Sequence, residues 1–190
     1  MRKIKNFKVN LRLREILRSV KKLINTVGLP VNFEEEVQRC CFFYSKFLVP
    51  SVIYEIFSKE TLHFKHDEDV PSKWIAASIF FLTIGNNLYE EYSKNTKTFG
   101  EYTGQIVSAV VADALQQAKN FVQRLISNEA EKENCEILRI VNVPQDLYSV
   151  IGEDIPINKI NISIEAGELM PRYSLCGLFY WIPSKKKIKK

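Results

Sequence analysis

The longest run of helical periodicity covers residues 98–127 and predicts a central helix on which the other elements pack. Apolar side chains recur there at intervals of three and four residues, which places them on one face of a helix. They are Val107, Val110, Val111, Ala114, Ala118, Phe121, Val122, Leu125 and Ile126. Thr98 and Glu101 have the spacing of a capping box at the start of this helix. Gly100 and Gly104 predict a neighbour that packs close to the helix backbone.

Two shorter helices and a hairpin are predicted before residue 65. Residues 13–27 form an amphipathic pattern with a basic outer side. A second helix over residues 33–47 begins after Asn32, which we expect to cap it. Residues 51–57 are rich in β-branched and aromatic side chains, and residues 61–64 follow after three polar positions. This spacing predicts an antiparallel pair of strands.

A short helix and a buried strand are predicted before the central helix. Residues 72–77 follow a proline and have the composition of a short helix. Residues 79–84 are apolar at nearly every position, as in a strand that is covered on both sides. Gly85 then opens a turn into another short helix that ends at Tyr92.

The last third of the chain has weaker patterns. Residues 128–136 are charged, and we expect a mobile link there, followed by a short strand over residues 137–141. Residues 144–152 allow one or two helical turns, and residues 160–164 and 175–182 predict two closing strands.

The predicted elements do not alternate regularly between helix and strand, so a doubly wound fold is excluded. We expect an α+β fold, with a mainly antiparallel twisted sheet, a long central helix across it and flanking helices. The length of 190 residues suits one domain over residues 1–190. Within it we expect a basic N-terminal helix in residues 1–27 and a basic tail over residues 184–190.

The formal net charge of +5 comes from the two ends of the chain. Residues 23–184 carry 13 basic and 21 acidic side chains. A protein that binds nucleic acid usually has its basic residues on one folded face, so solvated ends are favoured over nucleic-acid binding or electrostatic docking. The longest apolar stretch, residues 74–84, is too short to span a bilayer, and no signal peptide is expected. The four cysteines lack metal-binding spacing, so we expect reduced thiols and a cytoplasmic protein without a membrane partner.

General catalytic signatures are absent from the sequence. There is no phosphate-binding glycine loop and no nucleophile–histidine arrangement, so no catalytic residue is predicted. His63 and His66 flank residues 67–69, which are all acidic, but a strand would direct the two imidazoles to opposite faces. A solvated acidic turn is therefore favoured over a metal site. The residues alone predict an α+β domain without a defined activity.

Four segments together resemble the activation domain of cobalamin-dependent methionine synthase. They are FLVPSVIYEIF, FLTIGNNLYEEY, GEYTGQIVSAVVADAL and INISIEAGELMPRYSLCGLFYW. In the last segment Met170, Pro171, Ser174 and Gly177 are in step with the family pattern, and the resemblance runs in order over residues 11–183.

The resemblance implies a part in methionine biosynthesis. In this family the activation domain binds S-adenosylmethionine, whose methyl group, with an electron from a flavodoxin-like donor, converts inactive cob(II)alamin to methylcobalamin. The chain contains no segment like a methyltransferase or corrinoid module. We therefore expect a component that acts in trans on a corrinoid protein, which would carry the cobalamin, and not a self-contained methyltransferase.

The resemblance also implies a ligand site. The family has R-x-x-x-G-Y-P where this chain has Arg139 to Pro144 with one residue fewer, and Val143 replaces the Gly-Tyr pair. The planar fork of Arg139 can pair with the methionine carboxylate of S-adenosylmethionine, and Asp113 on the central helix matches a carboxylate that holds the amino group. The predicted cofactor-binding residues are therefore Arg139, Asp113, Val141, Val143 and Pro144. The alternatives are a surface ion pair for Arg139 and a solvent-facing helix position for Asp113.

Three functions remain open from the sequence. The first is a reactivation partner that binds S-adenosylmethionine and docks on a corrinoid protein. The second is a docking module that has lost the ligand, which the missing Gly-Tyr pair favours. The third is nucleic-acid binding through the basic ends, which the acidic body makes the weakest of the three.

Overall fold

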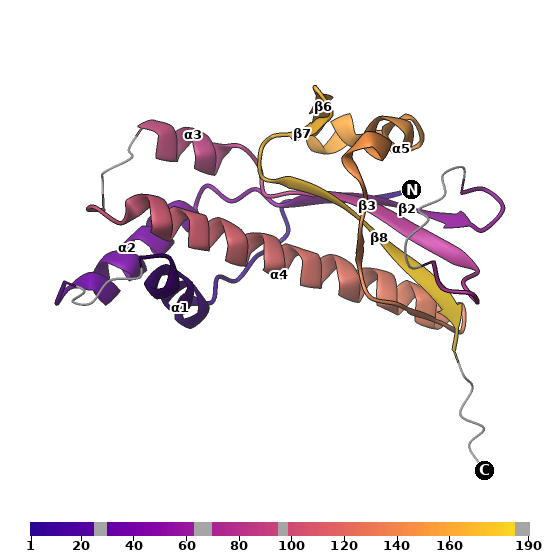
Figure 1. The fold of residues 1–190 in the computed structure, drawn as a ribbon, viewed down its shortest axis with the longest axis horizontal. Coiled ribbons are helices and arrows are strands. Elements are labelled where there is room, and N and C mark those ends of the chain that lie inside the picture. Colours follow the sequence, from indigo (N-terminus) through magenta and orange to yellow (C-terminus); the bar gives the residue numbers. More distant parts are fainter. Residues whose placement is uncertain (25–29, 63–69, 95–98, 185–190) are drawn as a thin grey trace, which may run out of the picture.

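The computed structural model describes residues 1–24, 30–62, 70–94 and 99–184. They form an α+β fold in which a long helix, α4, runs along a sheet (Figure 1). The helices are α1 (Leu13–Ile24), α2 (Phe33–Ser45), α3 (Asn87–Lys94), α4 (Thr103–Lys132), α5 (Tyr148–Asp154) and the 3₁₀ helices η1 (Gln145–Leu147) and η2 (Ile157–Ile160). The strands are β1 (Arg2–Lys5), β2 (Ser51–Ser58), β3 (Ala76–Thr83), β4 (Cys135–Ile137), β5 (Val141–Asn142), β6 (Ser163–Glu165), β7 (Glu168–Met170) and β8 (Ser174–Pro183).

The main sheet is antiparallel throughout its described pairings. Its strand order is β1-β2-β3-β8-β4, and β5 also pairs with β8. A separate two-stranded hairpin is formed by β6 and β7. The predicted fold class, a mainly antiparallel sheet with a long helix, is therefore confirmed.

The sheet has two buried faces, because successive side chains of a strand point to opposite sides. We call one the helix face: it packs against α1, α2 and α4 and holds Val52, Tyr54, Phe80, Leu82, Phe179 and Trp181. We call the other the second face: it packs against α5, η2 and the β6–β7 hairpin and holds Ile53, Ile79, Phe81, Cys176, Leu178 and Tyr180. Figure 1 shows α4 on one side of the sheet and α5 on the other.

The central helix is longer than predicted at its C-terminal end and starts later. It begins at Thr103, after Tyr102, and no side chain caps it; Thr98 of the expected capping box lies outside the described residues. Gly100 precedes the helix, with φ of 95°. The close neighbour expected at Gly104 is present, since a Cβ added there would lie 2.9 Å from the hydroxyl of Tyr92.

The two N-terminal helices are confirmed with small changes. Helix α1 starts at Leu13, as predicted, and is described as far as Ile24, since residues 25–29 lie outside the described part. Helix α2 follows Asn32, but this side chain makes no capping bond. Its amide instead donates to the Glu36 carboxylate at 2.9 Å.

Three predicted elements are wrong. Strand β2 pairs with β1 and β3, while Thr61 belongs to a turn and Leu62 to no strand; residues 63 and 64 lie outside the described part. Residues 72–77 form no helix, because Ala76 already begins β3. The expected link over residues 128–136 consists largely of the last turns of α4 and the start of β4.

The ends of the chain contain one unpredicted strand and one displaced strand. Strand β1 pairs with β2 from Arg2 to Lys5, although Ile4 is its one apolar residue. The predicted strand over residues 160–164 is shifted, because Ile160 ends η2 and β6 begins at Ser163. The closing strand is confirmed as β8. Among the described residues, no helix combines the length and apolar character needed to cross a membrane.

Candidate functional site

Arg139 lies in the short connection between β4 and β5. The amide of Leu138 donates to the Tyr180 carbonyl at 2.9 Å, and Val141 pairs with Leu178, so both ends of this connection are fixed on β8. The Arg139 side chain is exposed, and within the described part of the chain it makes no hydrogen bond or ion pair. The alternative of a surface ion pair is therefore not realised there, and the guanidinium is free to meet an external carboxylate.

The residues that follow Arg139 close the space beside it with apolar side chains. Val143 is 5% exposed and belongs to the second-face core, together with Ile151. Val141 is half-buried and packs against the same core. Pro144 precedes the 3₁₀ helix η1 and is also half-buried. Of this loop, Arg139 presents the one charged side chain, and Asn142 is exposed as well; neither has a side-chain partner among the described residues.

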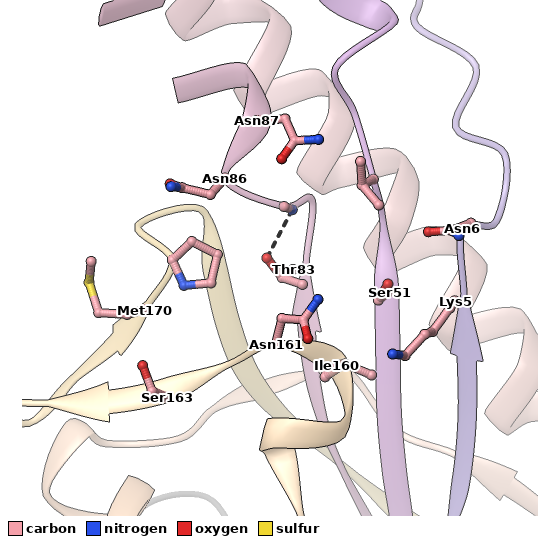
Figure 2. Close-up of a pocket in the computed structure, with 13 residues that line it drawn as sticks. Lys5, Asn6, Ser51, Thr83, Asn86, Asn87, Ile160, Asn161, Ser163 and Met170 are labelled. Atoms are coloured by element: carbon pink, nitrogen blue, oxygen red, sulfur yellow. Dashed lines mark hydrogen bonds between the residues drawn. The ribbon is translucent and has the colours of Figure 1, made fainter. Parts of the chain in front are cut away.

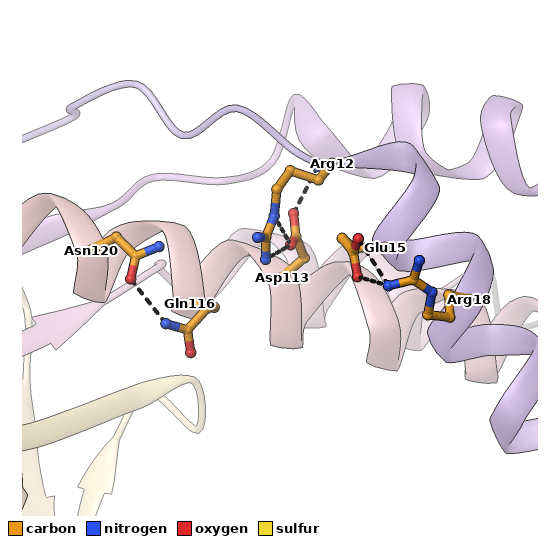
Figure 3. A network of polar contacts seen from close by, with 6 residues as sticks. All are labelled: Arg12, Glu15, Arg18, Asp113, Gln116 and Asn120. Carbon is orange, nitrogen blue, oxygen red and sulfur yellow. Dashed lines mark hydrogen bonds and ion pairs between the residues drawn. The ribbon is translucent and has the colours of Figure 1, made fainter.

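Asp113 is already paired within the chain (Figure 3). It is buried on α4, and Arg12, just before α1, donates to it three times. The backbone amide of Arg12 lies 2.8 Å from Oδ2, and Nε and Nη2 lie 2.9 and 2.7 Å from Oδ1. The expected alternative, a solvent-facing position, is wrong. A ligand amino group could reach this carboxylate only by displacing Arg12.

A cavity of about 580 Å³ opens at the end of the second face (Figure 2). Neither Arg139 nor Asp113 lines it. All of its lining residues except Lys5 and Asn6 come from three of the four segments that resemble the methionine synthase family. Ser51 and Thr83 are its buried polar lining residues, with 5% and 2% of their surface exposed. The sequence carries no signal for this cavity, because its walls come from five separate stretches of the chain.

Gly85 shapes the wall of this cavity where β3 leads into α3. Its φ is 83°, a conformation that glycine adopts without strain. A Cβ at this position would also lie 3.1 Å from the Cβ of Val49. The Gly85 amide donates to the Thr83 hydroxyl at 3.0 Å, which holds the turn against the strand.

The buried cysteines are structural. Burial raises the pKa of Cys40 and Cys41 to about 12, so both thiols stay protonated and unreactive at neutral pH. Burial also raises the pKa of Cys176. Within the described residues, no group of three or more metal-ligating side chains is found, and His63 and His66 lie outside this part.

Comparisons with known proteins give one result of interest. No protein-family model and no curated protein matches the chain. Among solved structures, the chain is similar to a crystal structure of the MetH reactivation domain bound to AdoHcy. The superposition covers 92% of this chain and 76% of that one, with a TM-score of 0.49 and 14% sequence identity.

Proposed function

We propose that this protein is an accessory component of a cobalamin-dependent methionine synthase, which docks on a corrinoid protein and serves in its reductive methylation by S-adenosylmethionine. The sequence resemblance supports the kind of partner, since its four segments supply β2, the end of β3 with most of α3, the N-terminal half of α4, and most of β8. The observation that carries the ligand is the exposed guanidinium of Arg139, which has no partner among the described residues.

Arg139 would hold the carboxylate of S-adenosylmethionine. An arginine binds a carboxylate through two parallel N–H···O bonds, and its planar fork fixes the orientation of the ligand. The connection on which it sits is tied to β8 at Leu138 and Val141, so its backbone is anchored on both sides. The ligand supplies the methyl group, and the chain would supply position and orientation.

A second candidate is a docking module that binds the corrinoid protein without S-adenosylmethionine. Two observations favour it: Val143, which stands in place of the family's Gly-Tyr pair, is buried in the second-face core, and Arg12 is bonded to Asp113. A docking surface needs neither residue to be free. The two candidates share the partner and differ in the ligand.

Calorimetry with S-adenosylmethionine separates the two candidates. We expect saturable heat with the native chain, and affinity lower by roughly tenfold to a hundredfold in Arg139→Ala, because a bidentate charged pair is lost. Arg124→Ala is the matched control, since Arg124 is an exposed arginine on α4 without a partner among the described residues. Absence of heat at millimolar ligand, with and without a corrinoid protein, leaves the docking module.

The shared part of the proposal is tested by reactivation in trans. The chain is added to a cob(II)alamin-loaded methionine synthase that lacks its own activation domain, with S-adenosylmethionine and reduced flavodoxin. Formation of methylcobalamin, followed by its absorbance, is expected only when the chain is present. Co-migration of the two proteins in gel filtration without methylation supports docking alone, and the absence of both results refutes the proposal.

A further inference from the structure

The second face of the sheet ends in a row of polar side chains. The row consists of Lys5, Ser51, Thr83 and Ser174, which occupy matching register positions on β1, β2, β3 and β8. Side chains at matching positions of neighbouring antiparallel strands lie on the same face of a sheet. Two residues further along, the same strands place Ile53 and Phe81 in the apolar core. The row therefore marks a sharp change from apolar to polar lining, at the cavity of about 580 Å³.

Two hydroxyls in this row lack a partner. Ser51 lines the cavity with 5% of its surface exposed, and its hydroxyl makes no hydrogen bond with any described residue. The Ser174 Oγ, two strands away in the row, is also buried and unpaired among the described residues, although Ser174 does not line the cavity. Thr83, between them, donates to the Tyr173 carbonyl at 3.4 Å. Polar groups in folded proteins almost always have a partner, so the unpaired Ser51 hydroxyl, which faces the cavity, is available to a group from outside the chain.

The rim of the cavity presents further donors. Figure 2 shows Asn87 on one side of Ser51 and Thr83 and the side chains of Asn161 and Lys5 on the other, with the Lys5 amino group turned toward Asn161. Helix α3 begins at Asn87 beside the cavity, and the first amides of a helix have no partner within it and carry partial positive charge.

The charge of the lining selects for an anion. Lys5 is the one charged side chain among the lining residues, and no carboxylate is among them. The nearest acidic group on α3, Glu90, accepts a hydrogen bond from the Asn86 amide at 2.6 Å, so Asn86 is not counted as a donor. An ammonium or sulfonium group would find no counter-charge in this lining.

We propose that this cavity binds a small molecule through an oxyanion, either a phosphate or a carboxylate. The hydroxyl of Ser51 donates to the oxyanion from the floor, while the amide of Asn161 and the amino group of Lys5 hold it from the rim. The first amides of α3 face it from the remaining side. The cavity volume suits a ligand of metabolite size.

This site does not depend on the proposed function, because it shares no residue with the Arg139 connection. Arg139→Ala is expected to leave binding at the cavity unchanged. Failure of S-adenosylmethionine binding would therefore leave this inference standing, and the reverse also holds.

Amide-resolved NMR titration tests the site with two probes, inorganic phosphate and succinate, each up to about 10 mM, since single oxyanions bind in the millimolar range. Shifts confined to Gly85, Asn87, Asn161 and Ser163 are the expected result. Saturation with phosphate alone assigns a phosphate ligand, and saturation with succinate alone assigns a carboxylate. Shifts confined to the basic side of α1, at Arg14 and Lys21, or no saturation with either probe, overturn the inference.

Two variants with matched controls complete the test. Asn161→Asp places a carboxylate in the cavity and is expected to abolish binding; Asp, like Asn, tolerates the φ of 58° at this position. Asn158→Asp adds the same charge on the exposed side of η2 and is expected to bind as the native chain does. Lys5→Gln is expected to weaken binding by about fivefold, and Lys3→Gln, on the same strand, to have no effect. Equal affinities in Asn161→Asp and Asn158→Asp refute the site.

Discussion

The two faces of the sheet are covered in different ways. On the helix face, one helix of 30 residues and two shorter helices cover the strands. Several polar groups on this face are paired within the chain: Arg12 with Asp113, the Trp181 indole with the Ser78 hydroxyl at 2.8 Å, and Tyr54 with a glutamate of α4. The buried Tyr44 hydroxyl and Glu129 Oε2 have no partner among the described residues and are enclosed by the core. On the second face, short helices and a hairpin form the cover.

Polar groups near the second face are left unpaired. Arg139 and Ser51 have no partner among the described residues, although one is exposed and the other is buried. The unpaired groups of the helix face are sealed inside the core, whereas Arg139 is exposed and Ser51 lines a cavity, so an external molecule can reach only the latter two.

The largest losses of stability are expected from replacing Phe80 or Phe81, two adjacent residues of β3 with no exposed surface. Phe80→Ala on the helix face removes a ring stacked on Phe179 at 5.5 Å and is expected to lower the free energy of unfolding by about 3–5 kcal/mol. Phe81→Ala on the second face is expected to cost about 1 kcal/mol less, because short segments can collapse into the cavity that is left. Urea unfolding measures both values, and equal losses would show that the two covers are packed equally well.

A smaller loss is expected when Asp113 is left without its partner. Arg12→Ala leaves the Asp113 carboxylate, which is 4% exposed, without its guanidinium partner. We expect the free energy of unfolding to fall by about 2 kcal/mol, which is less than for a fully buried pair because Arg12 is half-exposed. Arg18→Ala removes an exposed pair with Glu15 and should cost less than about 0.5 kcal/mol. The double variant with Asp113→Asn measures the coupling; additive losses would refute a stabilising pair.

The pair between Tyr54 and Glu129 predicts a change at high pH. Burial, followed by the hydrogen bond to Glu129 at 2.6 Å, raises the pKa of Tyr54 to about 12. Because the folded-state pKa lies above the unfolded value near 10, this contribution is full below pH 10 and is lost as pH rises through about 12. Tyr54→Phe should lower the free energy of unfolding by about 1 kcal/mol at neutral pH. Between pH 10 and 12, the stability of this variant should fall less than that of the native chain, as urea unfolding at each pH measures.

The smallest effect on stability is expected at the edge of the second face. Arg139→Ala should leave the free energy of unfolding within about 0.5 kcal/mol of the native value, because the side chain has no described partner to lose. Thermal unfolding followed by circular dichroism measures this. A loss comparable to that of Arg12→Ala would place Arg139 in the framework and remove it as a ligand-binding candidate.

The helix face was largely predictable from sequence, because helical periodicity over many residues is a strong signal. The end of α4 was missed since residues 128–132 are charged and only Ala130 is buried there, although alanine, glutamate and lysine favour helices. Strand β1 could not be predicted from four residues with one apolar side chain, because its pairing with β2 defines it.

The candidate sites were less predictable, because their geometry depends on contacts across long sequence separations. Arg139 could be singled out from its motif, but nothing near Asp113 indicates that Arg12, 101 residues earlier, occupies it. The row of Lys5, Ser51, Thr83 and Ser174 forms because four strands pair in one register. The sequence of four separate strands does not reveal that register. Pairing decides which polar groups stay free, and pairing is a property of the folded chain.

The outer strands of the main sheet have a consequence for how copies of the protein behave at high concentration. On one side, β1 has four residues, three of them positively charged; on the other, β4 and β5 have three and two residues. Such charged or interrupted borders are poor templates for strand addition by another chain. Fibril growth and sheet-to-sheet aggregation therefore have no long, uncharged border to start from in this sheet.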